Sequence, residues 1–350
     1  MSVTQNVEAV LTDRVLSGKY RDGEKIPSIR ELSCELNASY VIVFRAIQNM
    51  KRKQYLESRG RTGIFVRRNA ECKFRSDARE VAVVFADPAR NPREEYQLEV
   101  YTHLQSLLRE RGYLDLALRF DETSLRCACN PAGAIVFHQS PLLPWFRKNR
   151  IPVVYCSSIS ADEPFSSVSP DFYQGSYAVT EYLIACGHKR IGLVSAADPA
   201  NRGSFTMRAK GYADAMADHS LESLDELSWS VESSAAKKQL ERMFLGKQPP
   251  TALFVTNDVM GIEVLHFLQK RGIRIPEDVS IAGLEDMRCS RFSNPPLTTA
   301  SYDKRVLAEE TVVLLESLIS GRESGPLNRR IPMSLALRGS VQTIAPCTEE

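Results

Sequence analysis

Residues 168 to 194 read Val-Ser-Pro-Asp-Phe-Tyr-Gln-Gly-Ser-Tyr-Ala-Val-Thr-Glu-Tyr-Leu-Ile-Ala-Cys-Gly-His-Lys-Arg-Ile-Gly-Leu-Val, and this stretch decides the fold. We expect a helix that begins after Gly175 and ends at Gly187, a residue suited to a helix C-cap. Its apolar residues recur at helical spacing: Ala178, Tyr182 and Ala185, with Val179 and Leu183 beside them. The apolar run 191–194 then predicts a short buried strand. A helix followed this closely by a strand is half of a βαβ unit.

The same alternation extends along the chain from Glu80 onward. Continuous apolar runs predict parallel strands buried on both faces at 81–85, 134–137, 153–155, 191–194, 252–255 and 279–282. Helical patterns lie among them at 95–111, 175–186, 204–217, 235–245 and 259–271. The fold class is therefore α/β with a doubly wound parallel sheet. Ligands of such sheets bind outside the carboxyl ends of the strands.

Polar residues follow each of the six predicted strands. They are Asp87 and Arg90, His138 and Gln139, Ser157 and Ser158, Ser195, Thr256 to Asp258, and Glu285 with Asp286. Loops are polar in most proteins, so no single residue of this set distinguishes a binding site from an ordinary loop. Six strands that all end this way predict a hydrogen-bonding cleft.

The charge of the chain is unevenly divided. Residues 1–68 carry thirteen Lys and Arg against seven Asp and Glu, a net charge of +6, and the remainder carries a net −4. A basic head on an acidic body predicts a module that binds a polyanion. A solvated basic face is the alternative, and charge alone does not choose between them.

The head has the pattern of three helices and a hairpin. An apolar stripe predicts a first helix at 5–17, Ser28 and Glu31 form a capping box that starts a second, and Ser39 caps a third. The third buries Val43, Ala46, Ile47 and Met50, which leaves Val41, Arg45, Gln48 and Arg52 pointing outward. A hairpin at 55–66 turns at Arg59-Gly60-Arg61-Thr62-Gly63. These elements predict a winged helix-turn-helix, which places its third helix in a DNA major groove.

The head resembles the N-terminal domain of the GntR family. The matching residues are Gly18, Gly23, Pro27, Ser28, Arg30 to Leu32, Ser39, Val43, Arg45, Ala46, Gly63, Phe65 and Val66. The chain departs from the family pattern at Tyr40, Ile42 and Phe44. The resemblance implies binding of double-stranded DNA through Ser28, Arg30, Ser39, Tyr40, Val41, Arg45, Arg61 and Gly63. Serine and arginine suit phosphates, and Val41 or Ile42 suits a thymine methyl group.

Residues 80 to 344 resemble the effector domain of LacI/GalR repressors. The signature residues are Asp171, Gly175, Leu183, Gly187, His188, Arg190, Ile191 and Gly192. Further matches are Arg208 with Gly211, Pro250 and Ala252 with Asn257 and Asp258, Gly283 to Asp286, Leu297 to Thr299, and Arg338 to Ser340. Glu285 stands where the family usually has a ligand-binding Asp. The resemblance implies a two-lobed, periplasmic-binding-protein-like sensor whose ligand meets Asp87, Arg90, His138, Arg208, Asn257, Asp258 and Glu285.

Together these features predict a DNA-binding domain at 1–68, a linker at 69–79 and a ligand-binding domain at 80–346. The chain is expected to cross between lobes near 165–175, 296–302 and 322–330. The combination resembles arabinose-repressor-type regulators, and it implies a homodimeric repressor that binds a pseudo-palindromic operator and responds to a small molecule. A sugar is the expected effector, with Tyr155, Phe205 or Trp229 as a candidate aromatic wall. The operator, the exact effector, the choice between repressor and activator, and the direction of the effector's action stay open.

Two other functions are weighed. Asp258, Glu285 and Asp286 can be arranged as acid and base around a sugar, but no nucleophile elbow, P-loop or zinc triad accompanies them, so no enzyme and no cofactor is expected. A transporter's solute-binding protein would carry a signal peptide, and none is visible. The eight scattered cysteines indicate reduced thiols in a cytoplasm, and no apolar run reaches the length of a membrane span.

Overall fold

The structure is a computed structural model that describes residues 3–16, 19–60, 62–67, 80–85, 95–118, 131–157, 165–196, 202–230 and 232–344. The chain divides into two compact units. One comprises Met1–Asp87, Gln105–Val154 and Thr311–Gly325, and the other Pro88–Leu104, Tyr155–Glu310 and Pro326–Glu350. Among the described residues, no helix has both the length and the hydropathy that crossing a bilayer requires.

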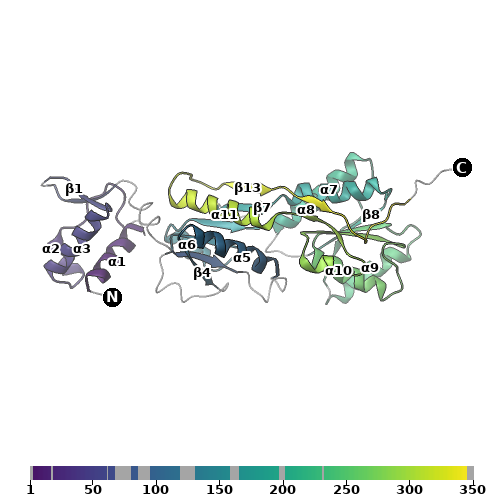
Figure 1. Ribbon diagram of the computed structural model, residues 1–350, viewed down its shortest axis with the longest axis horizontal. Coiled ribbons are helices and arrows are strands. Elements are labelled where there is room, and N and C mark those ends of the chain that lie inside the picture. Colours follow the sequence, from purple (N-terminus) through teal and green to yellow (C-terminus); the bar gives the residue numbers. More distant parts are fainter. Residues whose placement is uncertain are drawn as a thin grey trace. The chain divides into compact units, whose positions relative to one another are not determined.

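The N-terminal residues form three helices and a hairpin (Figure 1): α1 Val3–Leu16, α2 Ile29–Glu35, α3 Tyr40–Arg52, β1 Leu56–Ser58 and β2 Ile64–Val66. The hydroxyl of Ser28 accepts from the amide of Glu31, whose carboxylate accepts from the amide of Ser28 in return. The hydroxyl of Ser39 caps α3 by accepting from the amide of Ile42, without a reciprocal bond. The predicted stripe on α3 is buried against apolar residues of α1 and α2. The predicted winged helix-turn-helix is confirmed.

A six-stranded sheet follows, in the order β13-β7-β6-β5-β3-β4. Its strands are β3 Glu80–Val84, β4 Leu114–Leu118, β5 Gly133–Val136, β6 Val153–Cys156, β7 Ser166–Pro170 and β13 Asn328–Ile331. The helices of this part of the chain are α5 Glu95–Glu110, α6 Leu143–Lys148 and α11 Lys304–Ile319. Strand β3 pairs in parallel with both β4 and β5, so the strand order reverses at β3 and β5.

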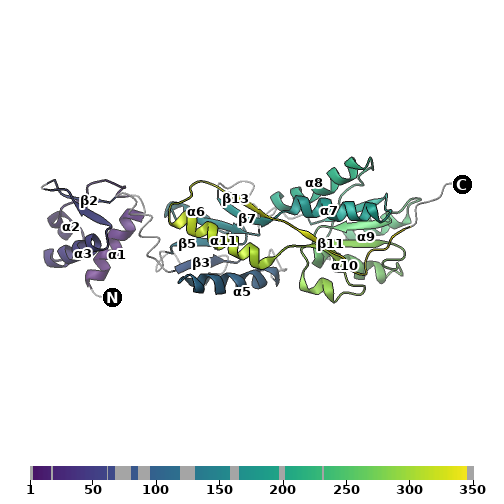
Figure 2. The same cartoon turned by 45° about the horizontal axis from the view of Figure 1, so that its top comes forward.

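A second six-stranded sheet has the order β14-β12-β11-β10-β8-β9. Its strands are β8 Ile191–Ser195, β9 Leu227–Ser228, β10 Ala252–Val255, β11 Ser280–Leu284, β12 Thr298–Ser301 and β14 Ser334–Ala336, of which β14 is antiparallel to β12. The helices are α7 Phe172–Ala185, α8 Arg202–Asp218, α9 Ser234–Leu245 and α10 Asp258–Gln269, with a 3-10 turn, η3, at Arg288–Arg291. Figures 1 and 2 show α7 and α8 on one side of this sheet and α9 and α10 on the other. The doubly wound α/β fold is confirmed, with a reversal of strand order at β8 and β10.

Helix α7 begins earlier than predicted. Asp171 caps this helix by accepting from the amide of Gln174, so α7 begins at Phe172 and Gly175 lies inside it. A Cβ at position 175 would lie 2.5 Å from the sulfur of Met333, so any larger residue would displace that side chain. The buried face consists of Phe172, Gly175, Ser176, Val179, Thr180 and Leu183, whereas Ala185 is exposed.

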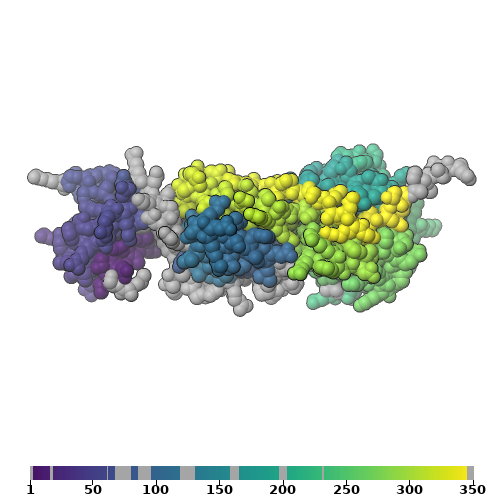
Figure 3. Space-filling view, viewed as in Figure 1, coloured from purple at the N-terminus to yellow at the C-terminus, as the bar shows by residue number. Residues whose placement is uncertain are grey.

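Several strands were not predicted because they lack continuous apolar runs. β4 is only partly buried, and β7 reads Ser-Ser-Val-Ser-Pro although every residue of it is buried. The segments expected to cross between lobes contain strands themselves: β7, β12 and β13. Figure 3 shows the last described part of the chain, in yellow, at the surface between atoms coloured teal and atoms coloured green.

Candidate ligand site and DNA interface

Helix α8 packs unusually close to α7 because Gly211 has no side chain. A Cβ at this position would lie 2.4 Å from the carbonyl oxygen of Tyr173 and 2.9 Å from the Cβ of Ser176. Arg208 lies almost one turn before Gly211, and the close approach holds its guanidinium carbon 4.0 Å from the centre of the Phe172 ring. A buried cation over an aromatic face is stabilised by the ring quadrupole.

Arg208, Glu285 and Asn257 form a connected polar cluster. Nη2 of Arg208 donates to Oε1 of Glu285 at 2.6 Å, while Nη1 donates to the carbonyl oxygen of Thr256. The side-chain nitrogen of Asn257, Nδ2, donates to the other carboxylate oxygen of Glu285, Oε2. Arg208 is 4% exposed and Glu285 9% exposed, so two opposite charges compensate each other away from bulk water.

Local structure fixes the other two members of this cluster. Asn257 caps α10 with its side chain. Its Oδ1 accepts from the backbone amides of Val259 and Met260 at 3.0 and 3.4 Å, which turns its Nδ2 toward Glu285. Glu285 has a φ of +105°, a backbone conformation that side chains disfavour. Its amide is held by the carbonyl oxygen of Ala300 at 2.7 Å.

Buried polar atoms without a partner lie on α8 and at the ends of β8 and β10. Among the described residues, four buried atoms in this region lack a hydrogen-bond partner: Nε of Arg208 and the hydroxyl oxygens of Ser195, Ser204 and Thr256. Ser195 ends β8 and Thr256 follows β10, which are the two strands where the order of the sheet reverses. A buried polar group without a partner costs about 1–3 kcal/mol, so a polar ligand that reaches these atoms recovers that energy.

Two tyrosines complete the surroundings of Glu285. Burial raises the pKa of Tyr302 and of Tyr96 well above the ordinary value, and the nearby carboxylate of Glu285 adds to both shifts. Both phenols therefore stay protonated at neutral pH and can donate hydrogen bonds. Tyr302 is also hydrogen-bonded to Ser157.

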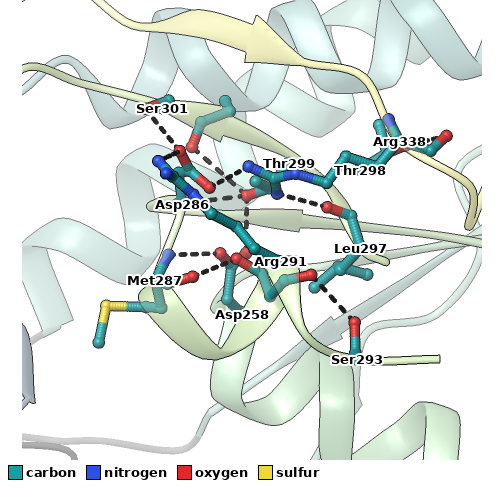
Figure 4. Close-up of polar contacts among 12 residues, drawn as sticks. Asp258, Asp286, Met287, Arg291, Ser293, Leu297, Thr298, Thr299, Ser301 and Arg338 are labelled. Carbon is teal, nitrogen blue, oxygen red and sulfur yellow. Dashed lines mark hydrogen bonds and ion pairs between the residues drawn. The ribbon is translucent and has the colours of Figure 1, made fainter. Parts of the chain in front are cut away.

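The two other carboxylates at this edge of the sheet are engaged within the protein (Figure 4). Asp258 accepts from the hydroxyl of Thr299 at 2.6 Å and from the amide of Met287 at 2.8 Å, and burial raises its pKa to about 7. A Cβ on Gly283 would lie 2.2 Å from Oδ1 of Asp258, which explains the glycine before Leu284.

Asp286 holds three segments together. It accepts from Arg338, from Arg291 at 3.0 Å and from Ser301 at 3.2 Å. Burial raises the pKa of Asp286, but the hydrogen bonds of the two guanidinium groups outweigh this effect and the pKa is lowered. Figure 4 shows this carboxylate between Arg291 and Ser301.

The predicted ligand residues fall into three groups. Arg208, Asn257 and Glu285 are brought together, and Asp258 lies beside them with both oxygens hydrogen-bonded inside the protein. His138 is buried just after β5 in the other sheet. Asp87 and Arg90 lie outside the described residues.

Of the candidate aromatic wall, Phe205 lies near Arg208 and Trp229 packs elsewhere. Phe205 lies 5.1 Å from the guanidinium carbon of Arg208. Trp229 instead packs edge-on against Phe267, and its ring nitrogen donates to Glu263 at 3.0 Å. Sequence reasoning missed Phe172, because the helix was expected to start after Gly175 and Phe172 was assigned to a loop.

The outward surface of the N-terminal domain carries the predicted DNA-binding residues. Six of them are exposed: Ser28, Arg30, Ser39, Tyr40, Val41 and Arg45. Each capping hydroxyl accepts a bond from its own helix, which leaves its proton free to donate to a phosphate. Within the described chain, neither Arg30 nor Arg45 forms an ion pair.

The hairpin is tied to the preceding loop by backbone pairing, in which the amide of Ile26 donates to the carbonyl oxygen of Ile64 at 3.0 Å. Gly63 has a φ of +129°, and a Cβ on it would lie 2.6 Å from Cε of Lys25. The guanidinium of Arg59 lies 4.6 Å from the Phe65 ring and bonds to Glu57 at 2.8 Å. Arg61 lies outside the described residues.

Two regions of the chain match known protein families. Residues 3–66 match the family of bacterial regulatory proteins named gntR, and residues 180–341 match the periplasmic binding protein-like domain. The HTH-type transcriptional repressor PurR of Haemophilus influenzae (strain PittEE) is 35% identical over 179 residues, which are 49% of this chain and 52% of that protein. The chain thus spans about half the length of the curated relatives it matches.

Solved structures share the fold. The complex of the transcriptional regulator CelR with cellobiose has a TM-score of 0.65 at 20% identity, over 90% of this chain and 100% of that one. The lac repressor dimer bound to operator and the anti-inducer ONPF has a TM-score of 0.61 at 21% identity, over 76% and 95% of the two chains.

Proposed function

We propose that this chain, a gntR-type regulatory domain joined to a periplasmic binding protein-like domain, is a repressor of transcription controlled by a small molecule. The carrying observation is the buried Arg208, Glu285 and Asn257 cluster, with its unsatisfied polar atoms, where the strand order reverses. The same chain presents a winged helix with an exposed third helix. The ligand changes the affinity for DNA because it binds more tightly to one of two conformations of the protein than to the other.

The proposed division assigns residues 1–68 to DNA, 69–79 to a linker and 80–346 to the ligand. The protein acts in the cytoplasm as a homodimer on a pseudo-palindromic operator, since a two-fold dimer presents two equivalent heads to the two half-sites. The solved lac repressor dimer on its operator supports this arrangement through its similar fold. Sedimentation of the full chain with DNA tests it, and a monomer at micromolar concentration contradicts it.

The head supplies phosphate contacts through Ser28, Arg30, Ser39, Arg45, Arg61 and Gly63. Because Lys and Arg release counterions when they bind phosphates, the logarithm of the binding constant should fall linearly with the logarithm of salt concentration. We expect Arg30→Ala and Arg45→Ala each to reduce that slope by about one. If binding to DNA does not depend on salt concentration, the assignment of these residues to phosphate contacts is wrong.

The proposed effector is a sugar. A guanidinium, a carboxylate and an amide together offer several donors and acceptors in fixed directions, as adjacent hydroxyl groups require. Arg208 and Glu285 compensate each other's charge, which favours an uncharged ligand. Asp87, Arg90 and His138 are proposed as further contacts, and Asp258 as a residue that positions the edge of the sheet.

Calorimetry with the full chain against pentoses, hexoses and purines identifies the ligand. Arg208→Ala should weaken binding about tenfold or more and abolish the ligand's effect on DNA. Lys210→Ala is the matched control, because this residue of the same helix is exposed and, within the part of the chain that the structure describes, contacts Asp214 and the Tyr173 ring. Thermal unfolding of each variant separates a lost contact from a lost fold. If Arg208→Ala responds to ligand like the wild type, or if Glu285→Asp binds better, the assigned site is wrong.

A further inference from the structure

The outward face of α3 begins with three exposed apolar side chains. Tyr40 is 50% exposed, Val41 55% and Phe44 42%. The rings of Tyr40 and Phe44, one turn apart, are stacked with centroids 6.3 Å apart and planes inclined by 11°. Neighbouring apolar residues exposed on one surface mark a binding site more often than scattered single ones do.

The core of the domain does not account for these residues. α3 buries Val43, Ala46, Ile47 and Met50 on its opposite side, and these four are essentially inaccessible. The apolar face of Tyr40, Val41 and Phe44 therefore contributes little to the stability of this domain.

Charge around this face favours a polyanion as the occupant. Arg45 follows Phe44 directly, and Arg30 on α2 is likewise exposed and unpaired among the described residues. The head as a whole carries a net charge of +6. An apolar protein partner would not require positive charge around this face. Duplex DNA fits both features, because it combines phosphates with one apolar group in its major groove, the methyl of thymine.

We propose that Tyr40, Val41 and Phe44 recognise thymine through its methyl group, so that the protein selects half-sites with T·A pairs where α3 lies. This inference rests on the proposed function, because it requires α3 to enter the major groove. The stacked rings form a flat apolar wall, and Val41 adds a branched side chain next to it. These residues distinguish thymine by burying a methyl group rather than by hydrogen bonds to base edges.

The test begins with selection of binding sites by the full chain from a random duplex library. Thymines in the selected sites are then replaced one at a time by uracil, which removes only the methyl group. Each contacted methyl should be worth about fourfold in affinity, as expected for one buried carbon. Uracil at thymines outside the α3 contacts should have no effect.

Variants assign the effect to side chains. Phe44→Ala and Val41→Ala should bring the ratio of thymine to uracil affinity close to one at the contacted positions. Gln48→Ala, exposed one turn further along α3, is the control and should keep the wild-type ratio.

The outcomes separate the two proposals. No enrichment of any sequence overturns the proposed DNA-binding function itself. Enriched sites that bind equally well with uracil overturn only the methyl readout. The inference is also overturned if Phe44→Ala changes sedimentation of the DNA-free protein while uracil is tolerated, because the face is then an interface between proteins.

Discussion

Nε2 of His188 lies 3.1 Å from the carbonyl oxygen of Gln342, a residue 154 positions later in the chain. Its Nδ1 lies 3.0 Å from the hydroxyl of Thr251. A carbonyl oxygen only accepts, so Nε2 carries the proton and Nδ1 of the neutral ring accepts from Thr251. The buried ring thereby joins the start of β8, the start of β10 and the end of the described chain.

The His188 ring should make stability depend on acid. Burial lowers the pKa of His188 below its ordinary 6.5, and the opposing effect of the Gln342 carbonyl is smaller. A lowered pKa means that the folded state prefers the neutral ring, so stability is complete above pH 6.5 and declines as the pH falls through the lowered value. His188→Gln should flatten the dependence of melting temperature on pH between 7.5 and 5, whereas the exposed His219→Gln should leave it unchanged. Equal slopes in wild type and His188→Gln contradict this role.

Asp258 should produce a pH dependence of the opposite sign. Because burial raises its folded-state pKa to about 7 from an ordinary 3.8, the folded state prefers the protonated carboxyl. This contribution is complete below pH 3.8 and is lost as the pH rises through 7, by at most about 1.4 kcal/mol per pH unit. Asp258→Asn should reduce that loss in urea titrations at pH 4.5 and 7, and the exposed Asp225→Asn serves as the control. If Asp258→Asn loses as much stability between pH 4.5 and 7 as the wild type does, this carboxyl is not the source of the loss.

Gly211→Ala should destabilise the second sheet's helical layer. The added Cβ would meet backbone, the carbonyl oxygen of Tyr173, which does not move as easily as a side-chain end. We expect a loss of about 1–3 kcal/mol, together with weaker ligand binding because Arg208 shifts with α8. Gly246→Ala is the control, since no atom lies within 4 Å of its Cβ position and its φ is −71°. Similar unfolding curves for the two variants dismiss the close-packing explanation.

Removing Arg208 alone should be worse than removing both charges of its pair. Arg208→Ala strands the buried carboxylate of Glu285 and should cost about 3–5 kcal/mol in the free energy of unfolding. The double variant Arg208→Ala with Glu285→Ala should recover part of this loss. Urea denaturation of both single variants and the double variant measures the coupling, and strictly additive losses refute it.

Sequence patterns within a few residues predicted much of the fold. The Ser28 and Glu31 capping box and the buried stripe of α3 depend on residues within a few positions of one another, and both formed as predicted. The continuous apolar runs became strands for the same reason. β7 was missed because its serines are buried by pairing with β13, more than 150 residues later, and no local pattern shows this.

Three members of the candidate site were predictable, but their contacts were not. Family resemblance placed Arg208, Asn257 and Glu285 in one set, and the structure brings these three together. Glu285 bonds to both Arg208 and Asn257. These bonds depend on the close packing of α8 on α7 and on the φ of +105° at Glu285. The engagement of Asp258 by Thr299 joins residues 41 positions apart, which spacing along the chain does not reveal.

The last strands of both sheets lie only two residues apart in sequence. β13 ends at Ile331 and pairs with β7 of the first sheet, and β14 begins at Ser334 and pairs with β12 of the second. Translation proceeds from the N-terminus at about 5–20 residues per second, so both sheets wait for the same short segment before their outer strands can pair. A ribosome that stalls before residue 328 leaves β7 and β12 each with an open edge, and such edges pair readily with other chains. Completion of the two sheets thus depends on the synthesis of one short segment.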